Sequence, residues 1–134
     1  MNIFISCVKK KGKTKCRAED MYISDLFKKR LAYAKKLGGE IYILSAKHGV
    51  LELDDVIMPY DLTLKNMKAI QKKRWAYRCY LQLKEKNIDF NEEAFFLAGE
   101  EYSKYLKLKF KNFYNPLKNM GLGYQLKWLK DEIK

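Results

Sequence analysis

Two short polar segments carry the residues of this chain that are best suited to chemistry. The first, Ser45-Ala46-Lys47-His48-Gly49, follows an apolar run and contains the single histidine of the sequence. The second, Pro59-Tyr60-Asp61, begins eleven residues after that histidine. Histidine titrates near neutral pH, and proline stiffens the backbone beside the phenol and the carboxylate. We therefore expect a chemical site here, with the histidine, the tyrosine and the aspartate as catalytic residues.

Each of these residues also has an ordinary structural interpretation. A histidine in a polar turn is often structural, and Asp61 can cap a helix beginning near Thr63 as readily as it can orient His48 or act as a base. Lys47 can bind a phosphate or a carboxylate, although exposed lysines often bind nothing. Ser45 precedes it in the same turn and is a candidate ligand contact. The residue types alone leave both interpretations open.

Polar groups also follow the other apolar runs. Ser6 and Cys7 end the first run and can supply a nucleophile or ligand contacts, and the lysine-rich segment after them includes Lys10. Gly99 follows residues 94–98 and would let a ligand approach the backbone, although glycine is equally common there for turn geometry. Open α/β sheets bind ligands beyond the carboxyl ends of their strands, so all these positions are candidate ligand contacts.

Alternating strands and helices must position these groups. Apolar residues recur with helical spacing over residues 23–37, with Arg30 and several lysines assigned to the solvent face and Gly38-Gly39 as the stop. Ser24 or Asp25 can cap this helix. Other helices are expected at residues 63–86, 100–109 and from 122 onward, and strands at 3–7, 41–44, 94–98 and 112–115.

The order of these elements predicts the fold class. Strand, helix, strand connections of this length favour parallel neighbours. We expect one α/β domain over residues 1–134, with three layers and a small, mostly parallel, four-stranded sheet flanked by helices. In such a sheet the polar strand ends meet at one edge.

Composition narrows the setting. The chain has 134 residues and a net charge of +12, which favours a polyanionic partner, although a lysine-rich composition also arises in AT-rich genomes. The apolar runs are too short to span a bilayer, and the N-terminus lacks the pattern of a signal peptide. We expect a cytoplasmic protein without a membrane partner; the oligomeric state is not indicated.

Metal and cofactor sites are not expected. Three cysteines without a C-x-x-C pair, and a single histidine, do not form a standard zinc pattern. The glycine-rich phosphate loop, the dinucleotide-binding motif and the nucleophile elbow of hydrolases are all missing from the sequence.

The motifs in their order along the chain resemble an uncharacterised domain family of bacteria and phages. The resemblance is carried by Ser6-Cys7, Tyr22-x-Ser24, Ser45-Ala-Lys-His-Gly49, Pro59-Tyr-Asp61, Leu97-Ala-Gly99 and Gly121-Leu-Gly-x-Gln-Leu-x-Trp128. This pattern is similar, more distantly, to the YaaA family of peroxide-stress proteins, described as DNA-binding, and to uracil-DNA-glycosylase-like and tRNA-guanine-modification-associated domains. The resemblance implies a nucleic-acid or nucleotide setting and adds Tyr22 and Ser24 to the candidate ligand contacts.

Two functional hypotheses follow. In the first, the protein is an enzyme acting on a nucleobase or an N-glycosidic bond, like a glycosylase or a nucleoside hydrolase. His48 and Lys47 would stabilise negative charge on the leaving base, and Asp61 would position water or balance an oxocarbenium-like sugar. In the alternative, the protein binds DNA, RNA or a phosphorylated nucleotide without catalysis, as a phage protein that sequesters nucleotides would.

Overall fold

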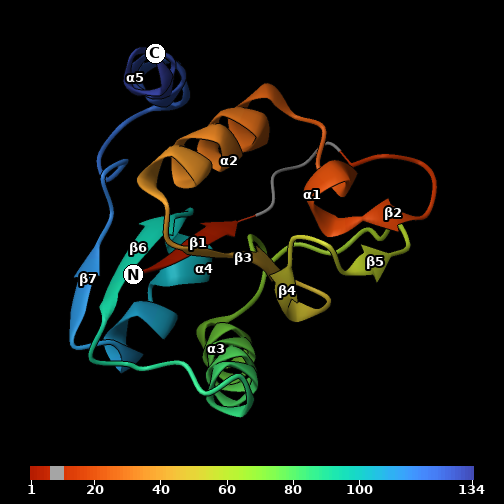
Figure 1. The fold of residues 1–134 in the computed structure, drawn as a ribbon. Coiled ribbons are helices and arrows are strands. Elements are labelled where there is room, and N and C mark those ends of the chain that lie inside the picture. The colour runs from red at the N-terminus through yellow and green to blue at the C-terminus, as the bar shows by residue number, and fades with distance from the viewer. Residues whose placement is uncertain (7–10) are drawn as a thin grey trace.

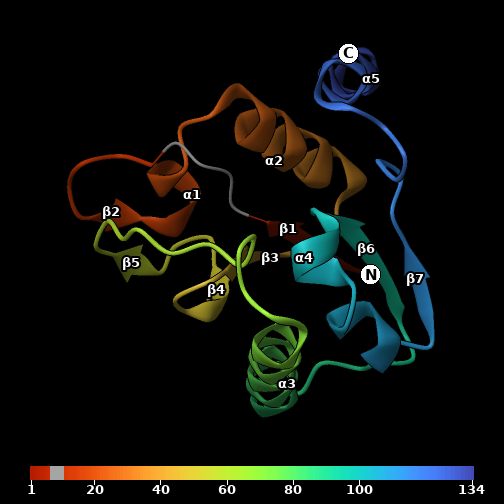
Figure 2. The same cartoon turned by 180° about the vertical axis from the view of Figure 1, so that it is seen from behind.

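The computed structural model describes residues 1–6 and 11–134, and Figures 1 and 2 show it from two opposite sides. Within the described residues, one sheet has five strands in the order β4-β3-β1-β6-β7. They are β1 (Asn2–Ser6), β3 (Glu40–Ser45), β4 (Gly49–Glu52), β6 (Glu93–Leu97) and β7 (Asn112–Tyr114). β1 is parallel to β3 and β6, and β6 is parallel to β7. The expected α/β class and mostly parallel sheet are confirmed.

Helices lie on both sides of this sheet. α2 (Asp25–Leu37) covers one side and α3 (Ala69–Glu85) the other, while α5 (Leu122–Ile133) packs on α2 (Figures 1 and 2). All five residues of β1 are buried. A strand covered on both faces must be apolar at consecutive positions, which explains the run Ile3-Phe4-Ile5.

The prediction of four strands was one too few. β4 pairs antiparallel with β3, so that the polar turn at Ser45–Gly49 joins the two strands of a hairpin. Gly49 has a φ of 76°, a conformation that glycine adopts without strain. Val50 and Leu51, which follow it, are buried against the core.

Two expected helices differ from the structure. The helix expected from Thr63 begins at Ala69, because the Thr63 hydroxyl accepts a hydrogen bond from the Lys65 amide (3.2 Å) and closes a local turn instead. The helix expected over residues 100–109 is divided into α4 (Glu100–Ser103) and the 3-10 helix η1 (Leu106–Lys109).

A small unit that the sequence did not predict stands beside the sheet. It consists of β2 (Cys16–Arg17), α1 (Ala18–Met21) and β5 (Val56–Ile57), with β2 and β5 antiparallel. The Ala18 amide donates to the Asp55 carbonyl at 2.7 Å, which joins two segments far apart in sequence. This unit brings the end of α1 next to the loop that carries Tyr60.

The strands place their polar ends at one edge of the sheet, as expected. Ser6 pairs in register with Leu44, the residue before Ser45, and Ile5 pairs with Leu97, two residues before Gly99. Because neighbouring strands lie about 4.8 Å apart, the ends of β3, β1 and β6 are immediate neighbours. We call this the carboxyl edge.

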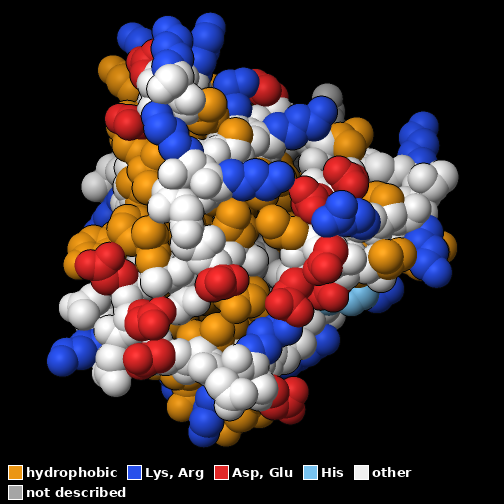
Figure 3. Space-filling model, viewed as in Figure 1, with side chains coloured by type: hydrophobic (Ala, Val, Ile, Leu, Met, Phe, Trp, Pro, Cys, Tyr) orange, Lys and Arg blue, Asp and Glu red, His pale blue; other side chains and the backbone are white. Residues whose placement is uncertain are grey.

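Charge is distributed unevenly over the molecule. Three glutamates stand at the opposite edge of the sheet: Glu40 begins β3, Glu93 begins β6 and Glu52 ends the antiparallel β4. On the face in Figure 3, acidic side chains gather across the middle, whereas lysine and arginine side chains gather at the upper end, over α2 and α5. In the described part of the chain, no helix is long and apolar enough to cross a membrane.

Candidate functional site

A cluster of three hydroxyl groups lies at the end of β3. The Ser45 hydroxyl donates to the Tyr60 oxygen at 2.8 Å, and the hydroxyl groups of Tyr22 and Tyr60 are 2.7 Å apart. Ser45 comes from β3, Tyr22 follows α1, and Tyr60 lies in the loop after β5. The Ser45 oxygen also accepts a hydrogen bond from the His48 amide (3.1 Å). The structure thus brings together four of the residues that the sequence singled out.

His48 lies in the hairpin turn with its ring edge against Tyr60, at 5.5 Å between ring centroids. Its pKa is lowered from the ordinary value, first by burial and then by the cations Lys47 and Arg78. The Nε2 atom is buried and has no hydrogen-bond partner among the residues that the structure describes. The lowered pKa favours the neutral imidazole at pH 7, with Nε2 enclosed by the protein.

Asp61 does not join this cluster. Its side chain is exposed and forms no hydrogen bond or ion pair with His48 or any other described residue. It does not cap α3 either, because that helix begins at Ala69.

Cations surround the hydroxyl cluster. The Lys11 ammonium group lies 4.6 Å from the centroid of the Tyr60 ring. Arg78 donates to the Lys47 carbonyl oxygen at 2.8 Å, which holds the guanidinium group beside the turn. Lys47 itself is exposed. This arrangement favours an anionic ligand near Tyr60 and His48.

A cavity of about 410 Å³ opens beside the ends of β6 and β7. Arg30 lies in its wall, 4% exposed, and donates to the Ser6 hydroxyl (3.2 Å) and to the Gln125 side-chain oxygen (2.9 Å). The Gly99 amide donates to the same Ser6 oxygen at 3.3 Å. Gly99 therefore lines this cavity, and the buried Ser6 hydroxyl lies behind the wall, where it holds Arg30 and Gly99 together.

Cations dominate the ionisable groups of this cavity. Arg30, Lys107 and Lys118 line it, against the single carboxylate of Glu100. The remaining lining residues are Ala98, Asn115, Leu117, Asn119, Met120 and Gln125. A wall of this kind suits a phosphate or carboxylate group.

The assignment of Arg30 to the solvent face of its helix was wrong, and the sequence missed this residue as a candidate. The apolar stripe of α2 includes Phe27 and Ala34, and position 30 lies between them at helical spacing. An arginine inside an apolar stripe is the signal that would have identified a buried cation. Gln125, which orients it, lies 95 positions away and gave no such signal.

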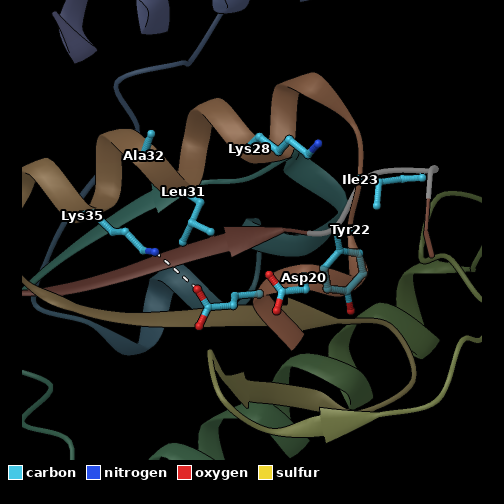
Figure 4. A pocket seen from close by; sticks show the side chains of 8 residues that line it. Asp20, Tyr22, Ile23, Lys28, Leu31, Ala32 and Lys35 are labelled. Atoms are coloured by element: carbon cyan, nitrogen blue, oxygen red, sulfur yellow. Dashed lines mark hydrogen bonds and ion pairs between the residues drawn. The ribbon is translucent and has the colours of Figure 1, made fainter. Parts of the chain in front are cut away.

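A further hollow of about 440 Å³ lies between α1 and α2 (Figure 4). Its charges are balanced, since Glu19 and Asp20 face Lys28 and Lys35, and Lys35 forms an ion pair with Glu19 at 3.3 Å. Tyr22 belongs to its wall while its hydroxyl bonds to Tyr60. The balance of charge makes this hollow a weaker candidate for an anionic ligand than the Arg30 cavity.

Of the remaining candidates, only Ser24 lies within the described residues. The Ser24 hydroxyl accepts the Phe27 amide (3.1 Å) and caps α2. Cys7 and Lys10 lie outside the described residues. Burial raises the pKa of the Cys79 thiol to about 12, so this group is protonated and unreactive. The structure shows no group of three or more metal-ligating side chains within residues 1–6 and 11–134.

Comparison with known proteins places the chain in a family. The uncharacterised protein YfjM of Bacillus subtilis (strain 168) is 33% identical over 128 residues, which cover 88% of this chain and 81% of the relative. No solved structure matches the chain significantly. Residues 3–131 match a family of unknown function, DUF6884. The expected membership of an uncharacterised family is thereby confirmed, and the chain belongs to the DUF6884 family.

Proposed function

We propose that this protein binds a phosphorylated nucleotide at the carboxyl edge of its sheet. The observation that carries the proposal is the Arg30 cavity, in which three cations and one carboxylate line a space of about 410 Å³. Cavities that bind small molecules typically measure about 300–1,000 Å³. A guanidinium group fixed by Ser6 and Gln125 is preorganised to meet a phosphate, because its side chain loses little freedom on binding.

The neighbouring hydroxyl cluster extends this surface. Lys11 and Lys47 add positive charge, and the aromatic rings of Tyr60 and His48 stand beside them. A ligand with its phosphate at Arg30 and its nucleoside toward His48 would use both places. β1 lies between the end of β3 and the end of β6, so such a ligand would extend across about 10 Å of the carboxyl edge.

Titration calorimetry with a nucleoside, its monophosphate and inorganic phosphate tests the binding proposal. We expect the monophosphate to bind more tightly than the nucleoside, and Arg30→Lys to weaken its binding by about tenfold through loss of a two-pronged phosphate contact. Arg17→Lys, at an exposed arginine, is the matched control and should bind normally. Equal affinity for nucleoside and monophosphate would refute the role of the cavity.

A second candidate function is cleavage of an N-glycosidic bond, which the neutral His48 favours. Breaking the bond between the sugar carbon and the base nitrogen leaves the electron pair on the base. Water then supplies hydroxide to the sugar and a proton to the base. For this role the buried Nε2–H group of His48 has to turn toward the ligand, where it would stabilise the departing base by donating to one of its oxygen atoms.

Release of free base, followed by chromatography, separates the two functions. For an enzyme, His48→Ala should abolish release while monophosphate binding persists. His48→Gln, which keeps a side-chain donor, should retain a measurable part of the activity. If neither free nucleosides nor single-stranded DNA release a base in the presence of the wild-type protein, the binding function alone stands.

A further inference from the structure

The outer surface formed by α3 and the segment around η1 combines one exposed and two half-buried tyrosine rings with lysines. We call this surface the tyrosine–lysine face. Its members are Tyr77, Tyr80, Tyr105, Lys73, Lys84, Lys104 and Lys109. We propose that the tyrosine–lysine face binds single-stranded nucleic acid, with bases stacked on the tyrosines and phosphates held by the lysines. This goes beyond the nucleotide cavity, which uses none of these residues.

The lysines and the rings already contact one another. The Lys73 and Lys104 ammonium groups each lie 5.5 Å from the Tyr105 ring centroid. Lys109 lies 4.9 Å from the ring centroid of Tyr80 and 6.0 Å from that of Tyr77. η1 therefore supplies a cation to rings on α3, and α3 supplies a cation to the ring before η1. The two segments form one continuous surface.

The face is open because the apolar stripe of α3 points elsewhere. Trp75, Cys79 and Leu83 are buried toward the sheet. Tyr77, on the opposite side of the helix, is 54% exposed. A tyrosine this exposed contributes little to the core, so its ring can accept a partner without any rearrangement of the fold.

The relative strength of the contacts favours nucleic acid as the partner. A cation–π contact at an exposed site changes an equilibrium constant by only about two- to fivefold. Stacking of one base on an aromatic side chain is worth about fivefold to more than a hundredfold. A base can therefore replace the lysine over a ring, and the flexible lysine is then free to contact a phosphate.

The geometry favours a single strand over a duplex. Tyrosine rings can be stacked only by bases whose faces are exposed, and the bases of a duplex are stacked on each other. From Lys73 to Lys84 the helix rises about 17 Å, enough for a short run of nucleotides. The lysines on this face complement the negative charge of a phosphate backbone. Glutamates, by contrast, lie at the ends of β3, β4 and β6 on the edge of the sheet away from the carboxyl edge.

Fluorescence anisotropy with a labelled 15-nucleotide oligothymidylate tests the proposal. Tyr77→Ala combined with Tyr105→Ala should weaken binding by about tenfold or more, with an unchanged slope against salt concentration. Tyr124→Ala, at an exposed tyrosine of α5, is the matched control and should leave binding unchanged. Circular dichroism confirms that each variant is folded.

Substitution of the lysines should change the salt dependence of binding, which substitution of the tyrosines leaves unchanged. Lys73→Gln combined with Lys109→Gln should flatten the slope of log affinity against log salt by about 1.4, since each phosphate contact on a single strand contributes about 0.7. Lys130→Gln, at an exposed lysine of α5, is the control for an unspecific loss of charge.

Three results would overturn the proposal: normal binding by the double tyrosine variant, equal binding of a duplex, or equal competition by polyglutamate, which would indicate an acidic protein partner.

Monophosphate binding by the same variants distinguishes this proposal from the nucleotide cavity. Loss of oligonucleotide binding with intact monophosphate binding places the effect on the tyrosine–lysine face. In Arg30→Lys we expect the reverse pattern, with monophosphate binding weakened and oligonucleotide binding intact. The two patterns distinguish a failure of the cavity from a failure of the tyrosine–lysine face.

Discussion

His48 is neutral because its environment disfavours a positive charge. Burial removes water from the ring, and Lys47 and Arg78 repel an added proton. The backbone around it is fixed: the Gln82 amide group donates to the His48 carbonyl (3.0 Å) and accepts from the Val50 amide (2.8 Å). At the scale of single residues, the site therefore presents a fixed, uncharged imidazole among cations.

This environment predicts a pH dependence of stability. Because the folded pKa of His48 lies below its ordinary value, the unfolded chain binds a proton at pH values where the folded chain does not. Stability should therefore fall as the pH is lowered through the ordinary histidine pKa of about 6.5 toward the folded value. Urea denaturation at pH 7.5 and 5.5 measures this change, and His48→Gln should remove part of it. An identical change in the variant would contradict the lowered pKa.

The Tyr60 hydroxyl group is hydrogen-bonded to the hydroxyl groups of Ser45 and Tyr22. Tyr60→Phe should lower the free energy of unfolding by about 1 kcal/mol, because the hydrogen bonds to Ser45 and Tyr22 are lost in a half-buried place. Tyr124→Phe, at an exposed ring, should change it by less than about 0.5 kcal/mol. Equal midpoints of urea unfolding for the two variants would show that the hydroxyl cluster does not stabilise the fold.

The turn between β3 and β4 is the element on which the site depends. Gly49 has positive φ, and a Cβ atom at this position would collide with the Gln82 side-chain oxygen. The same Gln82 side chain holds the backbone on both sides of the glycine. Any larger residue at this position displaces the contact that joins the turn to α3.

We expect Gly49→Ala to destabilise the protein by about 2–4 kcal/mol, through the left-handed backbone and the displaced Gln82. Gly123→Ala is the control, because a Cβ atom there meets nothing within 4 Å and lies in α5. That variant should be stabilised by about 0.5–1 kcal/mol. Thermal unfolding of both variants tests the contrast, and a stable Gly49→Ala protein would contradict the turn geometry.

Arg30 connects distant parts of the whole molecule. It lies on α2 and contacts Ser6 at the end of β1 and Gln125 on α5. α5 packs on α2 rather than on the sheet, with the Trp128 and Tyr33 rings 5.2 Å apart. Loss of Arg30 should therefore affect the cavity and the attachment of α5 together.

Arg30→Met should lower the free energy of unfolding by about 1–3 kcal/mol, since Ser6 and Gln125 lose a charged partner. Amide hydrogen exchange should increase in α5 more than in α3, because only α5 is tied through Gln125. Arg17→Met, at an exposed position, is the control for a general effect of charge. Equal acceleration of exchange in both helices would show that Arg30 does not anchor α5.

The sequence by itself determined the alternation of strands and helices and the mostly parallel sheet. These follow from local patterns, such as the apolar runs at Ile3–Ile5 and the stripe of α2, which neighbouring residues encode. Because parallel strands end at the same edge of a sheet, Ser6, Ser45 and Gly99 were expected to lie together there, and they do. The sequence also predicted that Ser45, His48 and Tyr60 belong to one site, because their two polar segments follow a strand of that sheet.

Only the tertiary structure decided what local patterns do not encode. The turn before β4 is bound by Gln82, which is 34 positions from His48, and the hydroxyl cluster joins Tyr22 to Tyr60 across 38 positions. The burial of Arg30 depends on Gln125, 95 positions away. Polar side chains of this kind are stable inside a protein only when partners from other elements satisfy them, and those partners become neighbours only when the chain has folded.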